Sequence, residues 1–189
     1  HALLASLRAA FSGRMVSDPA EMAPWLRDYR QRWGGPALAV VQPDSTADVA
    51  AVVRWCVEHD AVIVPQGGNT GLTGASVPLA DPRTTPRLEA RLRPVILLSL
   101  SRMQQIRSVD ALASTMVVEA GCTLQAAQEA AAAHGRLFPL SLASEGSCTI
   151  GGNLATNAGG VQVLRYGNMR ELCLGLEGVT ADGQVWHGL

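Results

Sequence analysis

Pro65-Gln-Gly-Gly-Asn-Thr-Gly-Leu-Thr-Gly-Ala-Ser-Val-Pro78 is a glycine-rich stretch that directly follows the apolar run Ala61–Val64. The apolar run is typical of a buried strand, so the glycines lie where that strand reaches the surface. Glycine readily adopts positive φ, and several such residues can point their peptide N–H groups into one concave site. Sites of this kind bind anions, most often phosphate. The stretch therefore predicts a phosphate-binding loop, against the alternative of an ordinary surface turn.

A second glycine-rich stretch lies about eighty residues further on, at positions 146–160. It reads Gly-Ser-Cys-Thr-Ile-Gly-Gly-Asn-Leu-Ala-Thr-Asn-Ala-Gly-Gly and, like the first, is rich in Asn, Thr and Ser. Two such stretches in a chain of 189 residues favour one large ligand that is held from two sides.

The spacing of the glycines distinguishes the first stretch from the common nucleotide-binding loops. Glycines at 67, 68, 71 and 74 do not fit Gly-x-Gly-x-x-Gly, the fingerprint of the Rossmann fold. The chain contains no lysine, and all 15 of its basic residues are arginine. The P-loop motif and a pyridoxal phosphate attached to a lysine of this chain are therefore excluded.

Three shorter motifs follow the glycine-rich stretches in a fixed order: Arg165-Tyr166-Gly167, Leu174-Gly175-Leu176-Glu177 and Ala181-Asp182-Gly183. This ordered set resembles the PCMH-type FAD-binding domain of the vanillyl-alcohol oxidase superfamily, in the branch of D-lactate, D-2-hydroxyglutarate and glycolate dehydrogenases. The resemblance runs from about Ala37 to the C-terminus. It implies an α+β fold of two lobes, a small βαβ-containing lobe and a second mixed-sheet lobe with flanking helices, with FAD in the cleft between them.

The resemblance also implies a role for each stretch. The first would wrap the pyrophosphate with peptide N–H groups, and the second would line the flavin and ribityl region. There, Gly151 and Gly152 would let the backbone approach the flat ring, and Asn153, Thr156 and Asn157 would supply donors. The implied cofactor-binding residues are Pro65, Gln66, Gly67, Gly68, Asn69, Thr70, Gly71, Leu72, Gly74, Ser76, Pro139, Gly146, Ser147, Ile150, Gly151, Gly152, Asn153, Thr156, Asn157, Ala158, Gly160 and Val179.

Several positions depart from the family pattern. Ser141 and Glu145 stand where relatives usually carry aspartate and lysine, which leaves the subfamily and the substrate open. Asn69 stands where members that tether FAD often carry histidine. Because an amide cannot form that bond, we expect non-covalent FAD. We expect Cys148, within the second stretch, to be a small buried thiol rather than a link to flavin.

Composition limits the class of protein. A hydrophobic content of 48% is typical of a globular domain. The net charge of −1 shows no excess of positive charge of the kind that binds nucleic acid. No apolar run approaches the ~20 residues that a membrane span needs. The four cysteines form no Cys-x-x-Cys pair and the four histidines have no ligand spacing. We therefore expect no metal site and a reducing compartment, either cytoplasmic or peripheral to a membrane.

The apolar pattern predicts three segments: an N-terminal helical segment at 1–36, FAD-binding subdomain 1 at 37–100 and FAD-binding subdomain 2 at 101–189. In the first, Trp25, Leu26, Tyr29 and Trp33 are spaced as a packed helical stripe. The second contains two strands, 37–41 and 61–64, which we expect to be parallel because one helix connects them. Ser45 should cap that helix, and Arg54 should lie on its solvated face.

Further along, residues 79–94 carry four arginines and predict a surface excursion, with a docking patch for an electron acceptor as the alternative. Strands are predicted at 95–100, 106–109 and 115–120, and a helix capped by Thr123 should end at Gly135. Residues 174–180 and 184–187 should form a hairpin with a type I′ turn at Asp182-Gly183.

The chain offers no convincing catalytic base. Arg165 and Tyr166 could lie near the flavin or simply pack a loop. By resemblance, the base, the metal ligands and the carboxylate-binding arginine belong to a C-terminal substrate domain that this chain lacks, so we expect a fragment that is inactive alone.

Two functional hypotheses follow. The first is the FAD-binding portion of an enzyme that oxidises a D-2-hydroxyacid by hydride transfer to FAD, with a quinone, cytochrome or electron-transfer flavoprotein as electron acceptor. The alternative is a non-catalytic FAD-holding subunit of a glycolate-oxidase-type or electron-transfer complex. An anion-binding module without flavin would be a third reading.

Overall fold

The structure is a computed structural model that describes residues 2–79 and 93–189. Most of the arginine-rich segment at 79–94 lies outside the described residues. The chain divides into two compact units. The first comprises His1–Arg102 with Glu177–Gly188, and the second comprises Met103–Leu176 with Leu189.

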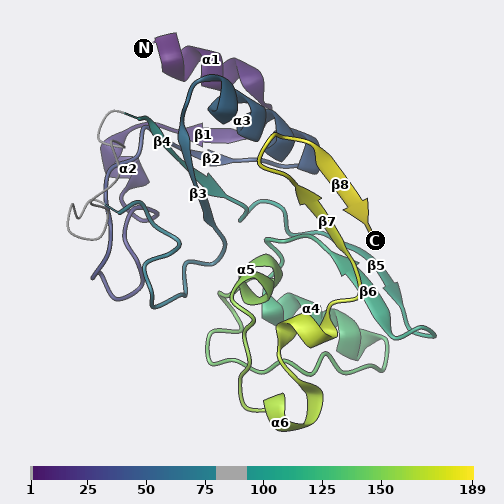
Figure 1. Ribbon diagram of the computed structural model, residues 1–189. Helices are drawn as coiled ribbons and strands as arrows, with labels where there is room; N and C mark the ends of the chain where they lie inside the picture. The colour runs from purple at the N-terminus through teal and green to yellow at the C-terminus, as the bar shows by residue number, and fades with distance from the viewer. Residues whose placement is uncertain (1, 80–92) are drawn as a thin grey trace. The chain divides into compact units, whose positions relative to one another are not determined.

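The first unit contains a four-stranded sheet in the order β1-β2-β4-β3 (Figure 1). Its strands are β1 (Arg14–Val16), β2 (Ala39–Gln42), β3 (Val62–Gln66) and β4 (Val95–Ser99). Strands β2 and β3 both run parallel to β4, which lies between them, and β1 joins antiparallel to β2. The predicted parallel arrangement is therefore confirmed, with β4 inserted between the two predicted strands.

Helices cover both faces of this sheet because successive strand residues point to opposite faces. On one face, α1 (Ala2–Ala10) and α3 (Thr46–Glu58) pack Leu7 and Trp55 into a cluster with Val41 and Ile96. On the other face, Met22 of α2 (Pro19–Met22) packs with Val40 and Leu97. The sheet is thus the middle layer of the first unit.

Helix α3 forms as its sequence predicts. The Ser45 side chain accepts a hydrogen bond from the N–H of Asp48, which satisfies one of the free donors at the helix start. Val52, Val53 and Cys56 are buried on the apolar face, whereas Val57 at the edge of that face is 61% exposed.

The N-terminal segment, predicted as helical over 1–36, is helical only in part. After α1 and β1, Asp18 caps the short helix α2, and residues 25–34 then form turns. Tyr29, which was expected in a packed stripe, is 75% exposed. The Asp28 side chain accepts hydrogen bonds from the N–H groups of Arg30 and Trp33, and this local bonding stabilises turns at the expense of helix.

The C-terminal hairpin of β7 (Leu176–Val179) and β8 (Val185–Gly188) belongs for the most part to the first unit. Arg54, expected in solvent, donates from Nη1 to the carbonyl of Gly183 at 2.8 Å and so ties the hairpin to α3. The hairpin is confirmed, but its turn is not type I′. Of the turn residues only Gly183 has positive φ, and its N–H donates to Thr180 O. This is the pattern of a type I turn followed by a glycine bulge.

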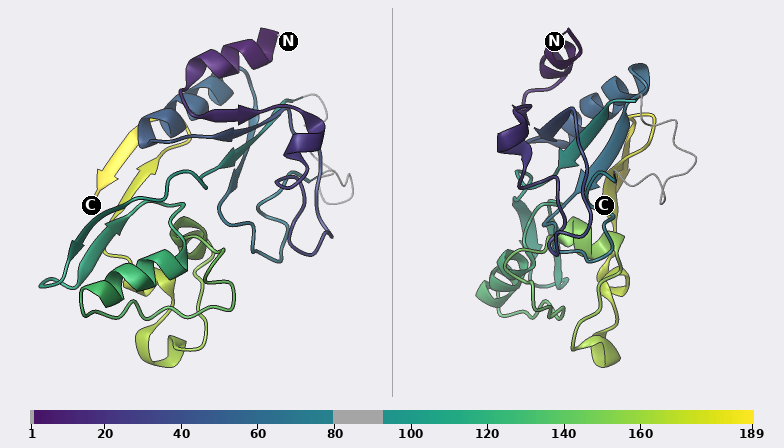
Figure 2. Two further views of the ribbon diagram at one scale, coloured as in Figure 1. Left: turned by 180° about the vertical axis from the view of Figure 1, so that it is seen from behind. Right: turned by 90° about the vertical axis from the view of Figure 1, so that its left-hand side faces the viewer.

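The second unit is built on an antiparallel pair, β5 (Ile106–Asp110) and β6 (Thr115–Val118). Helices α4 (Leu124–Ala133) and α5 (Ile150–Ala155) pack against this pair through a core that includes Leu124, Leu140 and Ile150 (Figure 2). The short α6 (Val163–Tyr166) and the 3₁₀ helix Met169–Leu172 follow. Thr123 caps α4, as predicted. The mixed sheet therefore lies in the first unit, and the second unit's strands pair antiparallel.

Candidate functional site

The three parallel strands of the first unit all end in a buried polar residue. Gln42 ends β2, Ser99 ends β4 and Gln66 ends β3, and their exposed fractions are 5%, 1% and 3%. In sheets of this kind, ligands bind beyond the carboxyl ends of parallel strands. The first glycine-rich stretch begins directly after Gln66 and therefore leaves the sheet at this edge.

Seven consecutive residues of the first stretch have peptide N–H groups with no partner among the residues that the structure describes. From Gly67 to Thr73, none of them donates a hydrogen bond to any group of the described residues. Gly67 to Thr70 are half-buried and Gly71 to Thr73 are exposed. Backbone donors that bond to none of the described residues are available to water or to a ligand. The stretch therefore fits a diphosphate, as the sequence predicts.

Side chains hold the two ends of this loop. Gln66 donates from Nε2 to the carbonyls of Trp25 and Ser76, at 2.9 and 2.8 Å. Asn69 donates from Nδ2 to Arg27 O at 2.7 Å, and its Oδ1 accepts from Ser76 Oγ at 2.8 Å. The side-chain amides of Gln66 and Asn69 therefore hold the loop, and the prediction that these two residues also contact FAD stays a prediction.

The second stretch lies in the second unit and forms a helix start rather than an open loop. Thr149 caps α5. The N–H of Ile150 donates to Cys122 O and that of Gly151 to Ala120 O, at 2.8 and 2.9 Å. A Cβ on Gly151 would lie 2.7 Å from the Ala120 Cβ. Close packing against Ala120 therefore requires a glycine at 151, and the prediction that Gly151 also lies near the flavin ring stays a prediction.

Three polar side chains of the second stretch, expected as donors to FAD, also make internal contacts. Thr156 Oγ1 donates to Gly152 O at 2.9 Å, and Asn157 Oδ1 accepts from the N–H of Arg170 at 3.0 Å. Asn153, 4% exposed, donates from Nδ2 to Cys148 Sγ at 3.5 Å. Cys148 is itself buried, in agreement with the expectation of a small packed thiol.

The remaining predicted site residues divide between the two units. Pro65 lies in β3, Thr70 and Leu72 lie in the first loop, and Val179 lies in β7 of the first unit. The others belong to the second unit, before or after α5: Pro139, Gly146, Ser147, Ala158 and Gly160. Each unit thus holds its own set, and the prediction that a single FAD contacts both sets stays a prediction.

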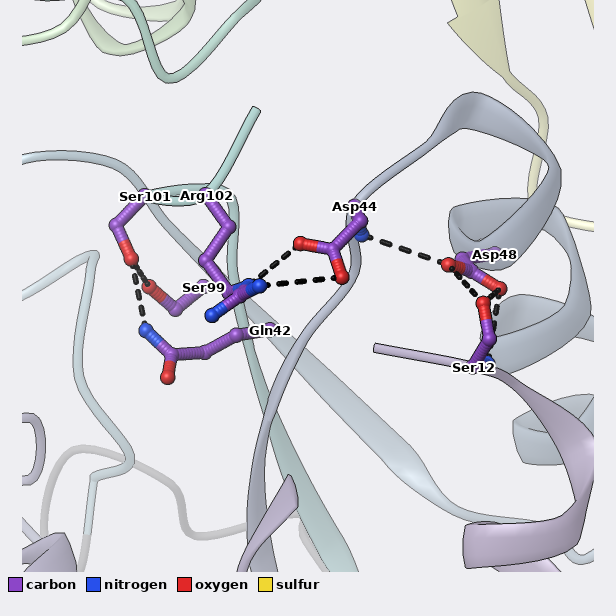
Figure 3. Close-up of polar contacts among 7 residues, drawn as sticks. All are labelled: Ser12, Gln42, Asp44, Asp48, Ser99, Ser101 and Arg102. Atoms are coloured by element: carbon purple, nitrogen blue, oxygen red, sulfur yellow. Dashed lines mark hydrogen bonds and ion pairs between the residues drawn. The ribbon is translucent and has the colours of Figure 1, made fainter. Parts of the chain in front are cut away.

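A polar cluster fixes the loops that follow β2 and β4 (Figure 3). Gln42 Nε2 and Ser99 Oγ both donate to Ser101 Oγ, at 2.8 and 3.0 Å. Beside them, the Arg102 guanidinium pairs with the Asp44 carboxylate. The Oε1 atom of Gln42 is buried and has no hydrogen-bond partner among the described residues. No sequence motif indicates this cluster, because its hydrogen-bonded members lie up to 59 positions apart.

The cluster continues to the start of α3. The Asp48 carboxylate, 8% exposed, accepts from the N–H and the Oγ of Ser12 at 3.0 to 3.1 Å. It also accepts a long bond from the N–H of Asp44. These contacts attach Ser12, just after the end of α1, to α3. Asp48 therefore has a structural role on the face of the sheet that these two helices cover.

Groups for acid–base or metal chemistry are not assembled in the part of the chain that the structure describes. Within it, no three His, Cys, Asp or Glu side chains are close enough together to hold a metal ion. The Arg165 guanidinium lies over the Tyr166 ring at 5.4 Å from its centroid, an arrangement that suits the packing of a loop. None of the helices in the described ranges has the length and apolar character to cross a bilayer.

Comparisons with known proteins agree with this geometry. Residues 37–188 match the family model described as an FAD binding domain. The chain is 41% identical over 190 residues to the D-2-hydroxyglutarate dehydrogenase, mitochondrial, of Bos taurus. The match covers 98% of this chain and 32% of that protein. It is 39% identical to the D-2-hydroxyglutarate dehydrogenase of Xanthomonas citri pv. viticola, over 91% of this chain and 34% of that protein. The chain thus spans about a third of these relatives' length.

Solved structures show the same fold. Alkyldihydroxyacetonephosphate synthase superposes with a TM-score of 0.83 at 20% identity, over 98% of this chain and 34% of that one. The 6-hydroxy-D-nicotine oxidase of Arthrobacter nicotinovorans gives a TM-score of 0.76 at 20% identity, over 94% of this chain and 36% of that one. These matches confirm the predicted α+β, PCMH-type fold. The chain therefore belongs to the family of FAD binding domains, and FAD is its cofactor.

Proposed function

We propose that this chain is the FAD-holding part of a flavin-dependent dehydrogenase that oxidises a D-2-hydroxyacid of the 2-hydroxyglutarate or lactate class. The observation that carries the proposal is the 41% identity to a D-2-hydroxyglutarate dehydrogenase over 98% of this chain. The free N–H groups of residues 67–73 support it, because they supply what a diphosphate needs without a cation.

The residues of this chain would bind and orient the cofactor. Bound FAD supplies the capacity to accept a hydride from a substrate carbon. Peptide N–H groups of the first loop would hold the diphosphate, while Gln66 and Asn69 keep that loop in place. The groups that bind the hydroxyacid and take up its hydroxyl proton are not identified within this chain.

We further propose that FAD is held without a covalent bond. Asn69 has an amide where a tethering histidine would be needed, and both ends of that amide are already hydrogen-bonded within the protein.

All four cysteines are free thiols, which is compatible with a reducing compartment such as the cytoplasm.

One experiment tests the cofactor and its mode of binding. The purified chain is mixed with FAD, passed through a desalting column and precipitated with acid. Flavin absorbance that elutes with the protein and then remains in the acid supernatant is expected. Flavin in the acid pellet would refute non-covalent binding, and no co-elution would refute FAD binding by this chain.

A second experiment tests the reaction, in the longest natural protein that contains this chain. Anaerobic addition of D-2-hydroxyglutarate or D-lactate should bleach the visible flavin bands, and the L-enantiomers should not. If the bands persist with both D-acids, the proposed substrate class is wrong.

A further inference from the structure

Residues 25–34 of the N-terminal segment contact the cofactor loop at three places. The carbonyl of Trp25 accepts from Gln66 Nε2, and the carbonyl of Arg27 accepts from Asn69 Nδ2. The Trp33 side chain fills the space next to Gly74, where an added Cβ would lie 2.6 Å from its Cγ. These contacts span the loop from its first residue to its last turn.

The loop has little internal bonding that could fix its shape. Within residues 67–77, the one backbone–backbone hydrogen bond among the described residues runs from the N–H of Val77 to Gly74 O, at a long 3.4 Å. Asn69 and Gly74 both adopt positive φ, at 53° and 77°. A glycine-rich loop without its own hydrogen bonds loses conformational entropy when it is ordered, so neighbouring groups must supply the ordering free energy.

Asp28 organises the segment that supplies these contacts. Its carboxylate is 2% exposed and accepts from the N–H of Trp33 at 2.7 Å and from the N–H of Arg30 at 3.2 Å. The backbone N–H of Asp28 also donates to Trp33 O at 3.1 Å. Asp28 therefore closes the turn that carries Trp33 back towards Gly74 and presents the Arg27 carbonyl to Asn69.

We propose that Asp28 is a positioning residue for the cofactor loop, acting through Trp33 on Gly74 and through the neighbouring carbonyls on Gln66 and Asn69. The proposal rests on the proposed role of that loop in holding the FAD diphosphate. Asp28 does not touch the cofactor in this account. It keeps the free N–H groups of residues 67–73 in one arrangement before the cofactor arrives.

Asp28→Asn tests this proposal, and Asp110→Asn is its matched control. Asp110 closes the β5–β6 turn in the second unit by accepting from the N–H groups of Leu112 and Ala113, both at 2.9 Å. Each change removes one carboxylate that accepts from two backbone N–H groups, although Asp28 is buried and Asp110 is exposed. Asp28→Asn should weaken FAD binding about tenfold through loss of a charged acceptor, whereas Asp110→Asn should change the Kd less than about twofold. Asp28→Ala should weaken it more than Asp28→Asn.

Limited proteolysis gives a readout that does not need FAD. Chymotrypsin cleaves after exposed leucines, and Leu72 in the loop is 49% exposed, whereas Leu164 in the second unit is fully exposed. Mass spectrometry of the fragments should show that Asp28→Asn accelerates cleavage after Leu72 and leaves cleavage after Leu164 unchanged.

The outcomes separate this proposal from the proposed function. If the unmodified chain fails to bind FAD, the proposed function fails, and the cleavage rate after Leu72 still decides the role of Asp28. An unchanged rate after Leu72 in Asp28→Asn would overturn the positioning role. So would an FAD affinity within about twofold of the unmodified chain in both Asp28 variants.

Discussion

The Trp33 side chain occupies the position into which a side chain on Gly74 would have to grow. A Cβ built on Gly74 would lie 2.6 Å from Trp33 Cγ and 2.8 Å from its Cδ1. Gly74 also has φ +77°, a conformation that other residues rarely adopt. Glycine is therefore required at position 74 for two reasons, its backbone conformation and the closeness of Trp33. The sequence alone does not distinguish it from the other glycines of the stretch.

Gly74→Ala should reduce both stability and FAD affinity, because it adds left-handed strain and displaces Trp33. We expect a loss of about 1–3 kcal/mol in the free energy of unfolding. Gly71→Ala is the matched control, since a Cβ there meets nothing within 4 Å and its φ is not in the left-handed region. Chemical denaturation of both variants checks the stability difference, and FAD titration of Gly74→Ala against the unmodified chain checks the affinity. An equal loss of stability at the two positions would contradict the prediction.

Gln66→Met should be far more damaging than Gln42→Met, although both glutamines are buried at strand ends. Gln66→Met removes two hydrogen bonds to carbonyls, a loss of about 2 kcal/mol, and releases both ends of the loop. Gln42→Met loses one bond but also removes a buried acceptor that has no partner in the described part of the chain, so we expect a change within about 1 kcal/mol. Urea denaturation measures the difference, and a larger loss for Gln42→Met would show that the assignment is wrong.

The contribution of Asp28 to stability should depend on pH in a specific direction. The N–H of Trp33 lowers the pKa of Asp28 most, against burial, which raises it. A carboxylate with a lowered folded-state pKa stabilises the protein above its unfolded pKa of about 3.9, and that stabilisation disappears as the pH falls through the folded value. The stability difference between the unmodified chain and Asp28→Asn should therefore be constant near neutral pH and shrink below about pH 4. A difference that grows on acidification would contradict this.

Thiol reactivity should rank the cysteines by their environment. Burial raises the pKa of Cys56 to about 11, and burial together with the charge of Glu119 raises the pKa of Cys122. The thiolate is the reactive form, so both should resist maleimide at pH 8 until the protein unfolds. Cys173, which is partly exposed, should react first. Peptide mapping after brief labelling measures the order, and labelling of Cys56 as fast as Cys173 would be incompatible with its burial.

The sequence predicted the features that depend on local pattern. Ser45 and Thr123 cap their helices as their spacing to the next apolar residues indicates. The strand before Gly67 and the C-terminal hairpin were found from apolar runs and turn residues. These elements are fixed by interactions within a few positions along the chain, which is the information that a single sequence carries most directly.

The features that depend on distant contacts could not be predicted in this way. The aromatic spacing of residues 25–33 suits a helix, but the Asp28 side chain bonds to nearby N–H groups and turns the chain instead. Arg54 has the spacing of a solvated residue, yet Gly183, 129 positions away, provides its acceptor. The second glycine-rich stretch has the composition of an open loop, and packing of Gly151 on Ala120 makes it a helix start.

The central claim is that main-chain N–H groups of residues 67–73 hold the diphosphate of FAD, and hydrogen–deuterium exchange tests it most directly. These amides have no acceptor among residues 2–79 and 93–189, so they should exchange quickly in the chain without FAD. Saturation with FAD should slow exchange in peptides that cover 67–73, while the β5–β6 turn at Asp110 should exchange at an unchanged rate. Bound FAD with undiminished exchange at 67–73 would contradict the account.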